Sequence, residues 1–513
     1  MPLLRLTQTA LTEDAWRVEL SLEREGQARQ TADATFSFVL TPQDDEDLRW
    51  YLEDYLEWPH DPTPKLAARV EGRMKEIGTD LFRAIFQAND DARDLWATLR
   101  AALADTRVEV VTGVREAAAI PWELLRDPKT DAPLALRCQA FVRALHNPVQ
   151  PPALPGATPE AIRILLVICR PGGRVDVPFR SVAARILKSL GAAARETFDL
   201  DVLRPPTFDV LSETLRRAHA AGRPYHVVHF DGHGAYADLP RMFKAWTESD
   251  EEGRRRMAKA WRVSRDRFSP EVLYPRPLRP GAHGFLVFES AASDDNQRWV
   301  DGQELGQLLV ETAVPVLVLN ACRSAHADVR EAPEAADQGE AHEQRRAWGS
   351  LAQEVMDAGV AGVVAMRYNV YVVTAAQFVA DLYASLAQGR PLGQAVTLGR
   401  KQLHTKPLRT LAFDPLPLQD WVVPVVYEAA PIALFPERAE DGGLEIHVDD
   451  ARITSAGGLD PSLPPTPDAG FFGRDETLLA LTAPSTPSGS SCSTPTPAAA
   501  RRRRRRSSRA GTS

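Results

Sequence analysis

The sequence predicts an α/β fold built on a doubly wound, mainly parallel sheet that is flanked by helices. Six apolar runs alternate with helical or loop segments: IRILLVIC (162–169), YHVVHF (225–230), GFLVFE (284–289), VPVLVLN (314–320), VAGVVAM (360–366) and WVVPVVY (421–427). Strands that are apolar throughout are typical of sheets covered on both faces. Between them lie amphipathic segments such as TAAQFVADLYASLAQG, in which Phe378, Leu382 and Leu386 share a helical face and Gly389 marks the end.

Residues 1–104 are expected to form a strand and helix region that supports a main domain over residues 105–436. The strand-like runs WRVELSLE and TADATFSFVL flank a hairpin turn at Gly26, which predicts a small antiparallel meander. Residues 46–104 then carry apolar residues at helical spacing, so helices are expected there.

The segments outside these patterns are polar or of low complexity. Two long polar insertions, 241–283 and 326–346, are typical of lids, binding loops or disordered segments. Residues 437–470 resemble a linker, and 471–482 begin with FFGRDETLLAL, which has the pattern of a further helix. Residues 483–513 are rich in Ser, Pro and Arg, so we expect a disordered tail.

The charge distribution argues against nucleic acid as a general partner. The formal net charge is −8, and the last thirteen residues contribute seven arginines, so residues 1–500 carry −15. Only the arginine-rich tail offers a contact for nucleic acid or acidic lipid. The apolar stretch in the opening MPLLRLTQTALTEDAW is too short for a targeting signal. No stretch of the sequence approaches the roughly 20 apolar residues of a membrane span. We therefore expect a cytoplasmic protein without a membrane partner.

Two strand ends carry residues suited to chemistry. In YHVVHFDGHGAYAD and VLVLNACRSAHAD, a polar segment of small residues interrupts an apolar run. The reactive crevice of an open α/β sheet lies at the carboxyl ends of its strands. If the two strands are parallel neighbours, His233 and Cys322 lie on the same rim. Gly232 and Gly234 flank His233 and are expected to let the backbone turn sharply there.

This pair suits acyl transfer. An imidazole at His233 could accept the proton of the Cys322 thiol and later protonate a leaving amine. The thiolate would then be the attacking atom, because a free thiol with a pKa near ~8.5 is mostly protonated at neutral pH. The amide N–H groups of Cys322 and Gly234 follow strand ends and are the expected donors to the oxyanion.

Two other interpretations compete. Cysteine is often buried, so Cys322 could be a structural residue at a strand end. A metal site could draw on His226, His229, His233, Cys322 and His326. We disfavour the metal site because the first two histidines are three residues apart on a strand and should point to opposite faces. The remaining cysteines, Cys138, Cys169 and Cys492, form no CxxC pair. Neither a metal nor a cofactor is expected.

The motifs HFDGHG (229–234) and LNACRS (319–324) closely resemble the paired motifs of CHAT-domain proteins, which are caspase-like cysteine peptidases related to separases and caspases. Other segments agree: IPWELLRDP (120–128), VPFRSVA (177–183), GFLVFE (284–289) and AWGSLAQEVMDAGVAGVVAMRYNV (347–370). The resemblance covers about residues 105–430 and implies a caspase-like fold. MRYNV departs from the family, in which many members have a tryptophan-containing strand end near residue 366.

Carried over to this chain, the resemblance implies that His233 is the general base and acid and that Cys322 is the nucleophile. The amides of Gly234 and Cys322 would form the oxyanion hole, and no acidic third member is required, so Asp231 is not assigned to a triad. The substrate-pocket candidates are the acids Asp231, Glu289 and Asp328 and the bases Arg180 and Arg323. A basic P1 residue is favoured, because the rim is richer in carboxylates and separase-like members share that preference.

The resemblance therefore implies a cysteine endopeptidase that acts on protein substrates. Regulation by a sensor or partner protein, in bacterial defence or cell-death signalling, is the implied context. The alternative is a catalytically silent caspase-like scaffold or signalling module. FFGRDETLLAL also resembles the opening of signal-transduction NTPase modules, but no GxxxxGK[ST] loop follows, which predicts a module that is cut short.

Overall fold

The computed structural model describes residues 1–11, 15–38, 40–58, 60–112, 120–146, 162–172, 198–261, 268–321, 351–368, 371–409 and 415–434. All of them belong to one compact unit, Met1–Val448. The expected linker, the NTPase-like segment, the tail and the insertion 326–346 lie outside the described residues.

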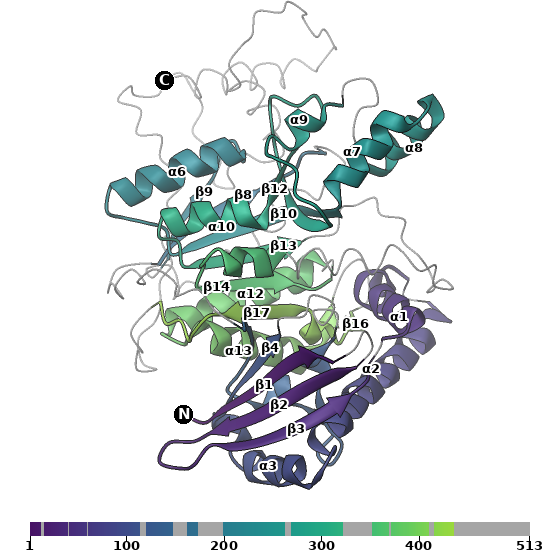
Figure 1. Ribbon diagram of the computed structural model, residues 1–513, viewed down its shortest axis with the longest axis vertical. Coiled ribbons are helices and arrows are strands. Elements are labelled where there is room, and N and C mark those ends of the chain that lie inside the picture. Colours follow the sequence, from purple (N-terminus) through teal and green to yellow (C-terminus); the bar gives the residue numbers. More distant parts are fainter. Residues whose placement is uncertain are drawn as a thin grey trace, which may run out of the picture. The chain divides into compact units, whose positions relative to one another are not determined.

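One sheet of thirteen strands organises this unit (Figure 1). Its order is β12-β11-β10-β13-β14-β17-β7-β4-β1-β2-β3, and β8 pairs with both β10 and β9. The strands are β1 (Leu3–Ala10), β2 (Trp16–Glu23), β3 (Gln30–Phe36), β4 (Arg107–Thr112), β7 (Ala140–Ala144), β8 (Ile162–Ile168), β9 (Phe198–Val202), β10 (Val227–Ala237), β11 (His283–Phe288), β12 (Arg298–Asp301), β13 (Val316–Ala321), β14 (Gly362–Met366) and β17 (Pro424–Glu428). Two further pairs are β5 (Arg126–Asp127) with β6 (Ala132–Pro133) and β15 (Leu408–Arg409) with β16 (Leu416–Pro417).

The central part of the sheet is parallel. Strands β9, β8, β10, β13 and β14 follow one another in parallel, whereas β17 is antiparallel to β14 and parallel to β7. This arrangement confirms the predicted α/β class with a large, mostly parallel sheet. The six apolar runs of the sequence all supply strands of it, because each is covered by side chains on both faces.

Helices cover both faces of the sheet. The longer helices are α1 (Pro42–Glu53), α2 (Thr63–Phe86), α3 (Asp90–Arg100), α6 (Phe208–Ala220), α7 (Leu239–Glu248), α8 (Glu251–Trp261), α10 (Gly302–Glu311), α12 (Val372–Ala387) and α13 (Leu392–Thr405). Single turns are α4 (Leu134–Arg137), α9 (Pro270–Leu273), η1 (Tyr55–Glu57), η2 (Leu103–Asp105), η4 (Trp122–Leu124) and η7 (Asp420–Val422). Val227 and Val318 share a buried cluster with α12 and α13, whereas Val228 and Leu317 share one with α6 and α10. Alternate residues of the central strands therefore face different helical layers.

The N-terminal meander continues the main sheet. Strands β1, β2 and β3 are antiparallel, with Gly26 at a φ of 71° in the turn between β2 and β3. Strand β1 pairs in parallel with β4 from Leu3↔Arg107 onward. The meander and the strands that follow therefore share one hydrogen-bonded ladder.

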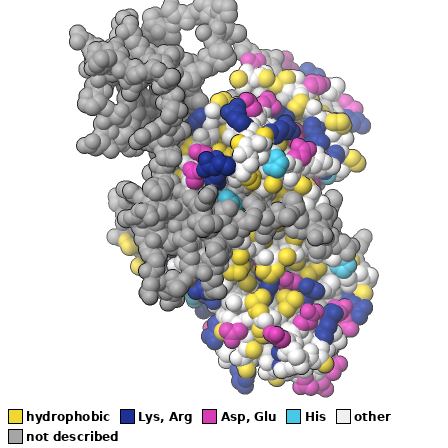
Figure 2. Space-filling view, turned by 90° about the vertical axis from the view of Figure 1, so that its left-hand side faces the viewer, with side chains coloured by type: hydrophobic (Ala, Val, Ile, Leu, Met, Phe, Trp, Pro, Cys, Tyr) yellow, Lys and Arg dark blue, Asp and Glu magenta, His cyan; other side chains and the backbone are white. Residues whose placement is uncertain are grey.

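The insertion after β10 is largely helical. Asp238 caps α7 by accepting from the backbone N–H of Arg241. Phe243 of α7 packs with Phe285 and Trp299, which covers the outer strands β11 and β12. On the face drawn in Figure 2, basic and acidic side chains of the described residues are interspersed. Among the described residues drawn there, charges of both signs therefore partly offset one another.

Candidate active site

Strands β10 and β13 lie side by side in parallel, as the chemistry proposed for their ends requires. Their register runs from Val227↔Val316 to Gly232↔Ala321. The last paired residues are those that immediately precede His233 and Cys322 in the chain. Cys322 itself lies outside the described residues.

The backbone does not turn at Gly232–Gly234, so the prediction of a sharp turn there is wrong. Strand β10 continues to Ala237, and His233 pairs with Val287 of the antiparallel strand β11. The reason is a change of partner along one edge of β10. Strand β8 pairs with β10 as far as Asp231↔Ile168, and from His233 onward β10 pairs with β11 instead. The backbone N–H and C=O groups that point to that edge of β10 thus keep partners without a turn.

Gly232 serves close packing instead. A Cβ at this position would lie 2.8 Å from two ring carbons of Phe230 and 3.2 Å from the Cβ of Cys169. Gly232 has no positive φ, so space and not backbone conformation excludes a side chain.

We expect Gly232→Ala to lower the free energy of unfolding by about 1–3 kcal/mol, because the added methyl group overpacks this contact. The matched control is Gly72→Ala in α2, where a Cβ meets nothing within 4 Å. That change should raise stability by roughly 0.5–1 kcal/mol, since alanine is the better helix former. Urea unfolding of both variants measures the difference, and equal effects at the two positions would contradict it.

His233 lies at the edge of the buried part of β10. Strand alternation puts it on the same face as His229 and Asp231, which are both buried. The side chain of His233 is half-buried, and Gly234 is exposed. An imidazole there is reachable from solvent while its strand is fixed by the sheet.

Asp231 is bound by Arg170, which lies two residues beyond the end of β8, and by Asn320 of β13. Its side chain is completely buried, and Oδ1 accepts a hydrogen bond from Nη2 of Arg170 at 2.6 Å. Oδ2 accepts from Nδ2 of Asn320 at 3.4 Å. The backbone N–H of Arg170 in turn donates to Oε1 of Glu289 at 2.8 Å. Two acids predicted for the substrate pocket, Asp231 and Glu289, are therefore joined through Arg170.

His229 and His226, which precede His233 in the same segment of the chain, have structural contacts. Nδ1 of His229 is 2.9 Å from the Tyr383 hydroxyl of α12, and Nδ1 of His226 accepts from the backbone N–H of Arg163. Burial lowers the pKa of His229 to about 4, against a small opposite effect of Asp231. Burial, assisted by the Arg163 charge, lowers the pKa of His226 to about 4. Both imidazoles are thus neutral at pH 7 and fix strand β10. Within the described ranges, no group of three or more His, Cys, Asp and Glu side chains is arranged to hold a metal ion.

Neither of the described cysteines suits nucleophilic chemistry. Cys138 and Cys169 are completely buried. Burial raises the pKa of Cys138 to about 12 and that of Cys169 well above the ordinary value. Three of the pocket candidates, Arg180, Arg323 and Asp328, lie outside the described residues, as Cys322 does.

Sequence patterns did not single out Arg170 or Asn320. Arg170 directly follows the apolar run 162–169, and Asn320 ends the run 314–320. A polar residue at the carboxyl end of a buried parallel strand was the available signal. The pairing of Arg170 with Asp231 could not be predicted from the sequence, because the two residues are 61 positions apart.

A family model described as the CHAT domain matches residues 83–429, about two thirds of the chain. The match begins within α2 and includes every strand from β4 to β17. No curated protein matches the sequence in a direct comparison. None of the helices in the described part of the chain has both the length and the apolar character needed to cross a membrane.

Proposed function

Because the chain belongs to the CHAT-domain family, we propose that it is a cysteine endopeptidase in which Cys322 and His233 form the catalytic dyad. The observation that supports the dyad best is the register Gly232↔Ala321. Neighbouring strands are about 4.8 Å apart. Continuing the register by one residue would bring His233 and Cys322 together, on the face where Asp231 already meets Asn320.

In the proposed reaction, His233 accepts the proton of the Cys322 thiol, and the sulfur attacks the carbonyl carbon of the scissile bond. The amide N–H groups of Cys322 and Gly234 would stabilise the oxyanion. His233 then donates its proton to the leaving amine as the C–N bond breaks. Water hydrolyses the acyl-enzyme and restores the thiol. Asp231 takes no part in this proton transfer, since its carboxylate is bound by Arg170 and Asn320.

We further propose a protein substrate with a basic P1 residue. At the described part of the rim, the Asp231 carboxylate pairs with the guanidinium of Arg170, and the Glu289 carboxylate accepts from the backbone N–H of Arg170. These three side chains carry two formal negative charges and one positive charge, a balance that supports a cationic P1 side chain. Control by a sensor or partner protein, in a defence or cell-death pathway, is the context that the family resemblance suggests.

A fluorogenic peptide panel with arginine, lysine or aspartate at P1 tests this function. We expect turnover with arginine and lysine that is lost in Cys322→Ala and kept in Cys492→Ala, which removes a thiol from the low-complexity tail. Turnover that survives Cys322→Ala would refute the dyad. Turnover only after aspartate would refute the P1 proposal and leave the dyad intact.

A silent scaffold is the second candidate, and the Arg170 contacts favour it, because they satisfy two potential pocket carboxylates within the protein. Alkylation by iodoacetamide separates the two functions. An activated Cys322 should react faster than N-acetylcysteine at the same pH, since the thiolate is the reacting species. Cys138 and Cys169 should stay unmodified until the protein unfolds, because burial raises the pKa of both thiols. A slow Cys322 and no peptide turnover would together support the scaffold.

A further inference from the structure

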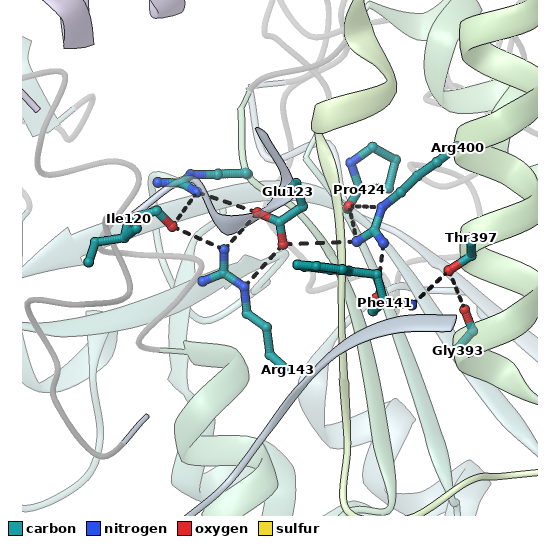
Figure 3. A network of polar contacts seen from close by, with 9 residues as sticks. Ile120, Glu123, Phe141, Arg143, Gly393, Thr397, Arg400 and Pro424 are labelled. Atoms are coloured by element: carbon teal, nitrogen blue, oxygen red, sulfur yellow. Dashed lines mark hydrogen bonds and ion pairs between the residues drawn. The ribbon is translucent and has the colours of Figure 1, made fainter. Parts of the chain in front are cut away.

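A single carboxylate faces three buried guanidinium groups next to the rim (Figure 3). Glu123 of η4 is almost completely buried, and both of its oxygens accept from Arg143 of β7, at 3.2 Å from Nε and 2.8 Å from Nη2. Nη1 of Arg367 is 3.7 Å from Oε2, and Nη2 of Arg400 is 4.0 Å from Oε1. The four side chains thus carry two more positive than negative charges.

The arginines differ in what else they bind. Arg400 of α13 donates to the carbonyl oxygens of Pro424 and Phe141, which ties the helix to β17 and β7 (Figure 3). Arg367 and Arg143 both donate to the carbonyl oxygen of Ile120, just before η4, from Nη1 at 3.1 Å and from Nη2 at 3.3 Å. The Arg367 side chain therefore joins the segment after β14 to the segment that carries Glu123.

Arg367 lies at the end of β14, level with the end of the neighbouring strand β13. It directly follows β14, and its backbone N–H donates to the carbonyl of Val423 at 2.9 Å. Strand β14 pairs with β13 up to Leu319↔Ala365. Two residues beyond this pair, the chain reaches Arg367 after β14 and Ala321 at the end of β13. Ala321 directly precedes Cys322. No other arginine of the cluster lies at this end of the sheet's central strands.

We propose that Arg367 is a positioning residue that fixes the end of β14 beside the strand end carrying Cys322; this role rests on the proposed peptidase function. Arg143 alone satisfies both oxygens of Glu123, so a further buried cation adds charge that the carboxylate does not require. Burial, together with the nearby Arg143 charge, lowers the pKa of Arg367, which reflects the unfavourable surroundings of its charge. In some proteins buried ionic groups favour a specific geometry over stability, and that is the role proposed for Arg367.

The test compares Arg367→Met with Arg143→Met, which removes a guanidinium from the same carboxylate but from strand β7. We expect Arg367→Met to lower kcat by about 10- to 100-fold with KM within about twofold, because displacement of a reacting group by about 1 Å has an effect of this size. Arg143→Met should lower the melting temperature more and kcat less. Arg367→Lys, which keeps the charge but not the planar fork, should restore only part of kcat.

Two kinetic results would overturn the proposal. One is a kcat for Arg367→Met within threefold of the wild type. The other is an equal loss of kcat in both methionine variants, measured well below their melting temperatures, which would indicate a merely structural cluster. If Arg143→Met does not fold, Arg143→Lys takes its place in the comparison.

Hydrogen exchange provides a readout that does not depend on peptidase activity. The amides of 316–321 and 362–366 should exchange faster in Arg367→Met than in the wild type, and those of 107–112 should not. Unchanged exchange at both strand ends would overturn the positioning role even in an active enzyme. Faster exchange in a protein that cleaves no peptide would refute the proposed function and leave the structural link of Arg367 in place.

Discussion

Replacing His233 by alanine is expected to lower kcat/KM for peptide hydrolysis by about 100- to 10,000-fold, the range over which general acid–base catalysis contributes. The side chain is half-buried where β10 pairs with β11, so its removal leaves no large cavity in the core. The free energy of unfolding should therefore change by no more than about 1 kcal/mol. Steady-state kinetics and urea unfolding of the same preparation measure the two effects.

The matched control is His229→Ala, on the same strand and face. His229 is fully buried and bonded to Tyr383, so we expect a loss of about 1–3 kcal/mol of stability and a small change in kcat at a temperature where the variant is folded. A second check is the double variant with Cys322→Ala, which should be no slower than either single variant, because members of one catalytic unit are not additive. Additive losses would contradict a shared step.

Much of the fold follows from local patterns. Each apolar run is buried on both faces, so its composition alone predicts a strand, and runs 162–169 and 314–320 became β8 and β13. The Gly26 turn was equally readable, because glycine readily adopts the positive φ that this turn has. These elements depend on neighbours within about ten residues in the chain.

What could not be predicted depends on distant partners. The glycines around His233 favour a turn locally, yet β11 offers a second ladder that begins about fifty residues later in the chain and extends β10. The sequence predicts Asp231 as an acid of the substrate pocket, but its carboxylate is bound by Arg170, which lies 61 residues away in the chain. The cluster around Glu123 joins residues up to 277 positions apart, and no local pattern distinguishes its arginines from surface ones.

Glu123→Gln is expected to cause the largest loss of stability, about 3–5 kcal/mol, because the three buried guanidinium groups lose the carboxylate that they face. Urea unfolding at pH 7 measures this loss. The control is Glu76→Gln in the surface pair with Arg73, where the Glu76 side chain is 66% exposed. That change should cost at most about 1 kcal/mol. Similar losses at both positions would contradict a counter-charge role for Glu123.

The pH dependence of this loss distinguishes charge from packing. Burial raises the pKa of Glu123, but the charges of Arg143 and Arg400 outweigh it and hold the pKa below the ordinary value. A carboxyl whose folded pKa is depressed contributes its full stability above the unfolded pKa of about 4.3, and loses it as the pH falls through the folded pKa. The stability difference between wild type and Glu123→Gln should therefore be constant from pH 7 to 5 and shrink below about pH 4. A difference that stays the same on acidification would assign the loss to packing, since the shape of the glutamine side chain does not change with pH.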